Sequence, residues 1–219
     1  MSITTDLIVP VYEDLLRRNF RWALDQGGLH FEGQSDVQKT LRRIARRLQE
    51  LEVPYAVAGG MALFAHGFER FTQDVDILVS REGLRVIHER LDGLGYVPPF
   101  TGSKNLRDTE FGVRIEFLVA GDYPGDGKPK PVAFPEPDEA AVPIEGIRFL
   151  SLPKLVELKL ASGMTGGIHR LKDLTDVVEL IKVLSLSDRF ADQLNPYVRD
   201  KYLELWQAVR DAPPGPDEG

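Results

Sequence analysis

The chain has 219 residues, of which 42% are hydrophobic and 28% charged, with a formal net charge of −7 and no cysteine. The composition is that of a globular protein, and the absence of cysteine excludes disulfides, thiolate metal sites and a cysteine nucleophile. The negative charge argues against a large nonspecific nucleic-acid surface. No run of 18 apolar residues occurs, and acids stand near the start where a signal peptide carries bases. Neither a membrane span nor export is therefore expected, and the expected location is the cytoplasm.

The N-terminal part of the chain is predicted to be helical. Residues 10–26 have the pattern of an amphipathic helix that ends near the glycine pair 27–28. Ser35 is a suitable N-cap for a second helix over residues 36–51, whose apolar residues recur at helical spacing. The arginines of this helix lie off the apolar stripe and are interpreted as a solvated face rather than a phosphate contact.

The middle of the chain alternates between strand and helix patterns. A short strand over residues 54–58 runs into Gly59 and Gly60, followed by a short helix over 61–68 and a strand over 72–79. A helix over 81–95 is expected to stop at Gly95. Further β-like segments are residues 96–100, 106–112, 113–121 and 147–151, and the Pro- and Gly-rich residues 122–143 are predicted to form a surface loop.

From residue 152 onward the apolar periodicity becomes helical, over residues 153–164, 170–184 and 188–212. The predicted fold is α/β, with a small mixed sheet, helices on one side and a helical C-terminal domain. The expected organisation is an N-terminal helical extension (1–34), a catalytic domain (35–150), a C-terminal helical domain (151–212) and a disordered tail (213–219).

Three acids stand inside otherwise apolar strands. Asp74 and Asp76 are one residue apart and point to one face of their strand, and Glu116 stands in the same way in "VRIEFLV", where Arg114 and Leu118 share its face. If these strands are neighbours, three carboxylates meet on one sheet face. Such a cluster repels itself, and hard divalent cations are the usual compensation. Two Mg²⁺ ions held by carboxylates and substrate phosphates form the clamp used for in-line nucleotidyl transfer.

A glycine pair lies just upstream of the acids, where a strand passes into a helix. Gly59 and Gly60 let the backbone approach closely, and free N–H groups at a helix start favour a phosphate. By itself the glycine pair is common in turns between a strand and a helix, and the acids by themselves could belong to a solvent-exposed edge strand. The combination indicates phosphoryl chemistry.

These motifs resemble the nucleotidyltransferase superfamily typified by DNA polymerase β. Residues 55–79 look especially like the AbiEii and MenA type of bacterial nucleotidyltransferase, whose "R-x-T-x-D-h-D" segment is matched by Arg70, Thr72, Asp74 and Asp76. The resemblance covers about residues 50–185. Many members carry Gly-Ser where this chain has Gly59-Gly60, so one serine contact to a phosphate is missing; Gly-Gly also occurs among antibiotic-modifying relatives, which leaves the substrate class open.

The resemblance implies roles for the remaining candidate residues. Asp74, Asp76 and Glu116 would be the catalytic metal ligands, and Gly59, Gly60, Arg70 and Thr72 would bind the nucleotide. In the family a lysine helix and a following basic-Asp-x-x-Asp segment close over the nucleotide; the matching residues here are Lys159, Arg170, Asp173 and Asp176. Lys159 could instead be a helix residue that extends along apolar surface, and the two aspartates could pair with Arg170 or Lys172.

The expected function is Mg²⁺-dependent transfer of a nucleoside monophosphate from an NTP to an acceptor hydroxyl. An RNA or tRNA end, or a protein, fits the toxin-type members, for which an antitoxin protein would be a partner. A small hydroxylated molecule such as an aminoglycoside fits the acidic net charge. A non-catalytic module that binds an NTP or an antitoxin is the alternative of another class.

Overall fold

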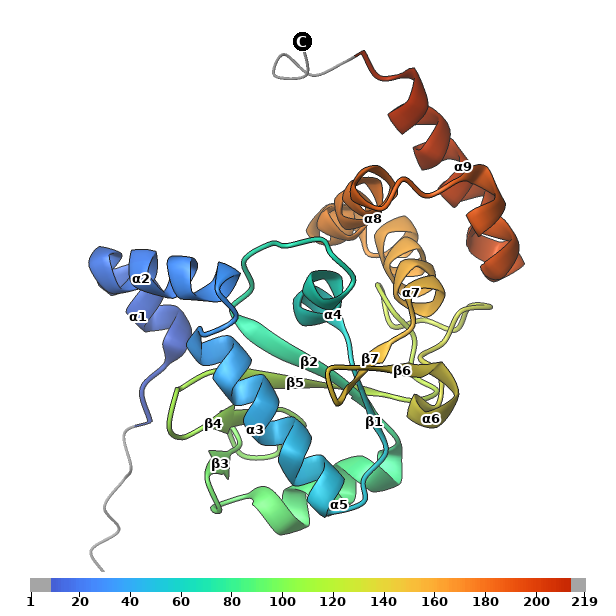
Figure 1. The fold of residues 1–219 in the computed structure, drawn as a ribbon. Helices are drawn as coiled ribbons and strands as arrows, with labels where there is room; N and C mark the ends of the chain where they lie inside the picture. The colour runs from blue at the N-terminus through green and yellow to red at the C-terminus, as the bar shows by residue number, and fades with distance from the viewer. Residues whose placement is uncertain (1–8, 214–219) are drawn as a thin grey trace, which may run out of the picture.

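A mixed sheet forms the centre of the protein (Figure 1). The structure is a computed structural model that describes residues 9–213, and within them the sheet has seven strands in the order β3-β4-β5-β2-β1-β7-β6. The pairs β2–β5 and β1–β7 are parallel, and the other pairs are antiparallel. The strands are β1 (Tyr55–Val57), β2 (Asp74–Val79), β3 (Tyr96–Val97), β4 (Leu106–Asp108), β5 (Arg114–Val119), β6 (Ala141–Ile144) and β7 (Ile147–Leu150).

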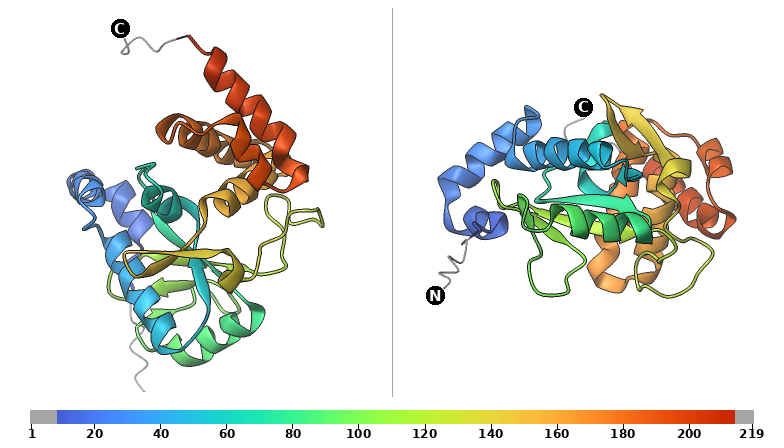
Figure 2. Two further views of the ribbon diagram at one scale, coloured as in Figure 1. Left: turned by 45° about the vertical axis from the view of Figure 1, so that its right-hand side comes forward. Right: turned by 90° about the horizontal axis from the view of Figure 1, so that it is seen from below.

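The helices form two groups around this sheet (Figures 1 and 2). α3 and α5 pack against the central strands, α4 packs against β2 and β7, and α7, α8 and α9 contact one another beyond the sheet. The first group is α1 (Tyr12–Arg18), α2 (Phe20–Phe31), α3 (Asp36–Glu50), α4 (Gly59–Ala65), α5 (Arg81–Leu91) and α6 (Pro137–Ala140). The second is α7 (Leu152–Thr165), α8 (Leu171–Val183) and α9 (Pro196–Asp211), with 3₁₀ turns at Gly167–Arg170 and Asp188–Gln193.

The predicted α/β class is confirmed, with a mixed sheet and a helical C-terminal part. Residues that alternate with the strand acids are fully buried, for example Val75 and Ile77 on β2 and Ile115 and Phe117 on β5. The alternation of β2 and β5 therefore separates a core face from a face that carries charge. None of the described helices is long and apolar enough to cross a membrane.

The N-terminal helix prediction was wrong in its boundaries. The chain breaks at Asn19, which ends α1 and caps α2 by accepting a hydrogen bond from the Trp22 amide at 3.1 Å. α2 then continues through Gly27 and Gly28, because glycine weakens a helix by only about 1 kcal/mol relative to alanine and tertiary packing can override that. The next helix is confirmed, including its Ser35 cap.

Three further boundaries differ from the prediction. The predicted helix over 188–212 is a 3₁₀ turn at Asp188–Gln193 followed by α9, because Leu194 is extended and Asn195 caps a new helix that begins at Pro196. α5 ends at Leu91 rather than near Gly95, because Asp92 is already extended and Gly93 adopts a positive φ of 75°. The predicted loop over 122–143 contains α6 and most of β6, which pairs with β7. Pro143 hid this strand from sequence reasoning, yet proline is tolerated here because β6 is an edge strand. Most of the predicted tail, residues 214–219, lies outside the described residues.

Candidate active site

A cleft with a volume of about 650 Å³ opens between the sheet and the C-terminal helices. One wall comes from β2, β5 and the start of α4, and the other from α7, the 3₁₀ turn after it and α8. The candidate residues Gly59, Gly60, Arg70, Thr72, Asp74, Asp76, Glu116, Lys159 and Asp173 all line this cleft. Asp176 lies behind the lining, where it contacts Lys159 and Arg70.

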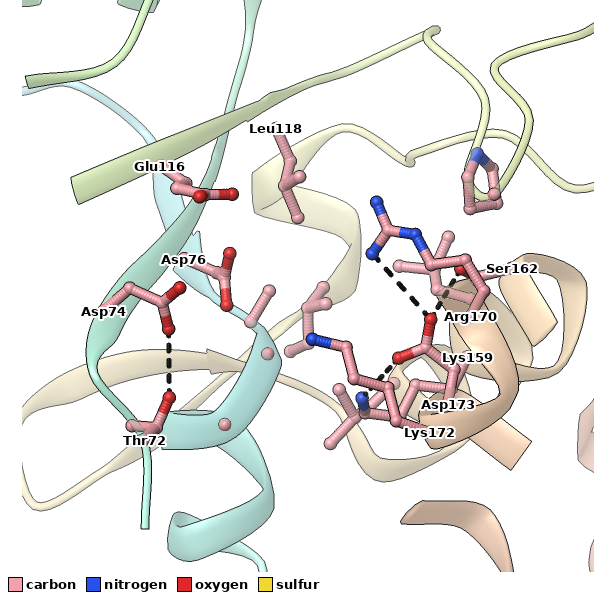
Figure 3. A pocket seen from close by; sticks show the side chains of 18 of the residues that line it. Thr72, Asp74, Asp76, Glu116, Leu118, Lys159, Ser162, Arg170, Lys172 and Asp173 are labelled. Carbon is pink, nitrogen blue, oxygen red and sulfur yellow. Dashed lines mark hydrogen bonds and ion pairs between the residues drawn. The ribbon is translucent and has the colours of Figure 1, made fainter. Parts of the chain in front are cut away.

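The three strand acids lie together on the first wall (Figure 3). β2 and β5 are parallel neighbours, and their register pairs Asp76 with Glu116 and Asp74 with Arg114. Because side chains alternate along a strand, this register directs all three carboxylates to one face. Asp76 and Glu116, which are 40 positions apart in sequence, thus lie side by side, as expected if the two strands are neighbours.

Arg114 compensates part of this negative charge. Its Nη2 atom lies 2.6 Å from Glu116 Oε1 and 3.3 Å from Asp74 Oδ2. Its Nε atom also lies 3.7 Å from Oε1 of Glu13 on α1. Sequence analysis placed Arg114 on the same face as Glu116 but gave it no role, and it assigned the compensation of the acids to magnesium. In the structure a guanidinium group balances two of the three carboxylates.

Asp76 is the carboxylate that Arg114 does not pair with. Burial raises the pKa of Asp76 to about 7, repulsion from Asp74 and Glu116 raises it too, and the charges of Lys159 and Lys172 partly oppose the change. A raised pKa means that the ionised carboxylate is destabilised at this position. A cation bound next to Asp76 would stabilise the carboxylate.

The glycine pair is fitted closely around the acids. Gly59 has a positive φ of 57°, and a Cβ atom there would lie 1.7 Å from Asp76 Oδ2. A Cβ atom at Gly60 would lie 2.7 Å from Cβ and Oγ1 of Thr72. The hydroxyl of Thr72 is hydrogen-bonded to Asp74 Oδ1 at 3.0 Å. Thr72 therefore occupies the space that a side chain at position 60 would need, which explains why glycine stands there.

The opposite wall carries a buried charge network. Lys159 Nζ lies 2.6 Å from Asp176 Oδ2 and 3.1 Å from Asp173 Oδ1, and Ser162 donates to Asp173 Oδ2 at 2.6 Å. Arg70 closes the network with its Nε atom 3.1 Å from Asp176 Oδ1. Burial alone would raise the pKa of Asp173, but Lys159 and Ser162 outweigh it and lower that pKa. The predicted nucleotide contacts of this set thus bind one another, and their role toward a nucleotide stays a prediction.

Sequence reasoning missed three contributors to the cleft. Arg114 bridges the acids, Ser162 binds Asp173, and Lys172 lines the cleft from α8. Alternation along β5 places Arg114 on the face of Glu116, but it does not show that the guanidinium group bridges the acids. Lys172 stands next to Asp173 in sequence, but nothing in the pattern distinguishes it from the other lysines of the helices.

The donor set of the first wall fits a hard divalent cation, because carboxylate oxygens are the ligands such cations prefer. Within residues 9–213, however, no three Asp, Glu or His side chains are already drawn together in a way that could hold a metal ion. Arg114 holds Asp74 and Glu116 in ion pairs, so metal binding would require the guanidinium group to release them. Glu13, which lies 3.7 Å from Arg114 Nε, is itself paired with Arg107 at 2.8 Å.

Comparisons with known proteins give structural similarities of low sequence identity. The sequence matches no protein-family profile and no curated protein. Among solved structures, ANT(2″)-Ia in complex with adenylyl-2″-tobramycin is 14% identical, with a TM-score of 0.48 over 78% of this chain and 95% of that one. A candidate nucleotidyltransferase from Thermotoga maritima is 21% identical, with a TM-score of 0.45 over 63% of this chain and 91% of that one. An antigenic nucleotidyltransferase-like protein from Paracoccidioides brasiliensis is 14% identical, with a TM-score of 0.46 over 80% of this chain and 92% of that one. At these values the similarity does not by itself assign an activity to this chain.

Proposed function

We propose that the protein is a nucleotidyltransferase of the DNA polymerase β superfamily that transfers a nucleoside monophosphate from an NTP to an acceptor hydroxyl. The observation that carries this proposal is the register of β2 and β5, which directs Asp74, Asp76 and Glu116 into one cleft beside Gly59 and Gly60. The motif resemblance around Arg70 and Thr72 supports the same reading.

In this reaction the acceptor oxygen forms a bond to the α-phosphorus, and the bond from that phosphorus to the β-phosphate oxygen breaks, releasing pyrophosphate. Asp74 and Asp76 would hold two Mg²⁺ ions, and Glu116 would hold the one nearer the acceptor. The ions, when bound, stabilise the attacking and leaving oxygens. Glu116 would also help to take up the proton of the acceptor hydroxyl. The N–H groups of Gly59 and Gly60 would bind phosphate oxygens.

The charges of the cleft favour an anionic acceptor such as an RNA end. Of the acids that line the cleft among the described residues, three are the proposed metal ligands, and the fourth, Asp173, is bound to Lys159 and Ser162. A polycationic aminoglycoside would find no unengaged carboxylate outside the metal site. Arg170 and His169 line the cleft and offer positive or hydrogen-bonding groups to phosphates, and Arg170 Nη1 also lies 3.9 Å from Asp173 Oδ2. An antitoxin partner is an expectation from the resemblance alone.

The test is transfer from NTPs radiolabelled at the α- or the γ-phosphate, with Mg²⁺ and separate pools of total RNA, total protein and an aminoglycoside. The proposal predicts that α-label enters RNA, that γ-label does not, and that EDTA abolishes the transfer. If the α-label enters only the aminoglycoside, the acceptor is a small molecule and the proposed RNA acceptor is wrong. NTP binding with no transfer to any pool would indicate a non-catalytic module instead.

A further inference from the structure

Lys172 is a cleft lysine without an acidic partner among the described residues. It follows Leu171, the first residue of α8, and is exposed. The nearby acids of its own helix are taken by other cations: Asp173 pairs with Lys159, and Asp176 pairs with Lys159 and Arg70. Figure 3 shows the Lys172 side chain extending from α8 across the cleft, toward the wall that carries Asp76.

Lys172 and Asp76 line the same cleft from its two walls, Lys172 on α8 and Asp76 on β2. An ammonium group placed in this way faces the space in which a substrate must lie between the two walls.

Lys159, the lysine that the motif resemblance selects, is placed differently. It is buried, and its ammonium group already contacts two carboxylates at 2.6 and 3.1 Å. Turning it toward a phosphate would break its ion pairs with the buried Asp173 and Asp176, which is costly. Asp176 would keep Arg70, and Asp173 would keep Ser162 and a contact with Arg170 at 3.9 Å. The lysine best able to meet a dense negative charge in the cleft is therefore Lys172.

We propose that Lys172, on the first turn of α8, is the residue that binds the β- and γ-phosphates of the incoming NTP. This inference rests on the proposed function. A lysine ammonium is a compact point charge with three donors, suited to phosphate oxygens that metal ions neutralise only partly. Lys159 then acts as a positioning residue that holds α7 and α8 together behind the site.

Lys182 provides a matched control on the same helix. It is exposed like Lys172, but it lies outside the cleft lining and pairs with Glu179 at 3.0 Å. Loss of either lysine removes one positive charge from α8, so a difference between the two variants reports position and not net charge.

The experiment measures the dissociation constants of inorganic triphosphate, the four NTPs and the corresponding monophosphates by calorimetry, with Mg²⁺ present. Lys172→Met should weaken binding of inorganic triphosphate and of the preferred NTP by about 10- to 100-fold, the size of one lost hydrogen bond to a charged group. Monophosphate binding and the melting temperature should stay close to those of the wild type. Lys172→Arg should recover most of the affinity, and Lys182→Met should bind as the wild type does.

Two outcomes would overturn the inference in different ways. If Lys172→Met binds triphosphates as tightly as Lys182→Met, while the wild type binds and transfers, Lys172 is not a phosphate ligand and the proposed function stands. If the wild type binds no triphosphate and transfers no label, the proposed function fails, and this inference fails with it.

Discussion

The two walls of the cleft both carry charged side chains, but they differ in how those charges are balanced. On the sheet wall, Arg114 pairs with Asp74 and Glu116, and Asp76 is left with a raised pKa of about 7. On the helix wall, Lys159 satisfies Asp173 and Asp176 directly, and the pKa of Asp173 is lowered. A charge that its neighbours satisfy serves the fold, whereas a charge left unsatisfied in a cleft is available to a cation or a substrate. Under the proposed function, the chemistry takes place at the sheet wall, and the buried part of the helix wall stabilises the fold.

The largest effect expected is on activity at the sheet wall. Asp76→Asn should reduce NMP transfer by about 1,000-fold, because a metal ligand that stabilises the transition state by several kcal/mol is lost. In metal-free buffer the variant should melt at the same temperature as the wild type or higher, since repulsion with Asp74 and Glu116 is relieved. Transfer assays and calorimetric melting of the two proteins check both statements. A sharply lower melting temperature would mark Asp76 as a structural residue and remove the contrast between the walls.

The second effect concerns stability at the helix wall. Lys159→Met should lower the free energy of unfolding by about 3 kcal/mol, because two buried carboxylates each lose one ion-pair partner. Lys182→Met, the exposed control, should change it by less than about 0.5 kcal/mol. Urea titrations distinguish the cases, and unchanged stability with lost NTP affinity would return Lys159 to the nucleotide site.

The third effect tests how closely the glycine turn fits the acids. Gly59→Ala should reduce transfer by about 100-fold, because the added Cβ atom would displace the Asp76 carboxylate and a misplacement of 1 Å is enough for such a loss. Gly93→Ala is the control, since Gly93 also has a positive φ but no atom within 4 Å of its added Cβ. Both variants carry backbone strain, and only the first moves a catalytic group. Equal activities of the two variants would show that Asp76 needs no fixed position.

The smallest effect concerns the N-terminal helices, at His30 of α2. Burial lowers the pKa of His30, whose ring nitrogens contact the Arg70 carbonyl at 3.0 Å and Ser35 Oγ at 3.3 Å. The unfolded chain takes up the proton first as the pH falls below about 6.5, so this residue makes the folded state lose stability on acidification. His30→Gln should have a flatter stability profile between pH 7 and pH 5. A profile parallel to that of the wild type would contradict the assignment.

Part of the sheet wall was predictable from sequence, because alternation along a strand is a local and periodic property. Alternation predicts that Asp74 and Asp76 share a face and that Glu116 joins them if the two strands are neighbours, and the structure shows that β2 and β5 are neighbours. The Arg114 ion pairs were not predictable, since they depend on side-chain conformations across two strands. Likewise β6 was missed because its pairing with β7 outweighs the presence of Pro143, and the break at Asn19 depends on one capping hydrogen bond.

The helix wall was less predictable, because helical periodicity places many residues on similar faces. Lys159 and Lys172 both lie before the Asp-x-x-Asp segment at Asp173 and Asp176, and Lys172 is directly adjacent to it. Sequence alone does not tell which of the two ammonium groups is buried and which faces the cleft. That choice is made by the packing of α7 against α8, which brings Lys159 to Asp173 and Asp176. Long-range packing of this kind leaves no signal in a single sequence.

The contrast between the walls is tested most directly by a calorimetric titration with Mn²⁺, a substitute for Mg²⁺, in the presence of a non-hydrolysable NTP. The account predicts saturable Mn²⁺ binding by the wild type, and binding weakened by at least about tenfold in Asp76→Asn, because a carboxylate ligand is lost. Equal Mn²⁺ affinity in the two proteins would contradict the assignment of the sheet wall as the metal-binding and reactive wall of the cleft.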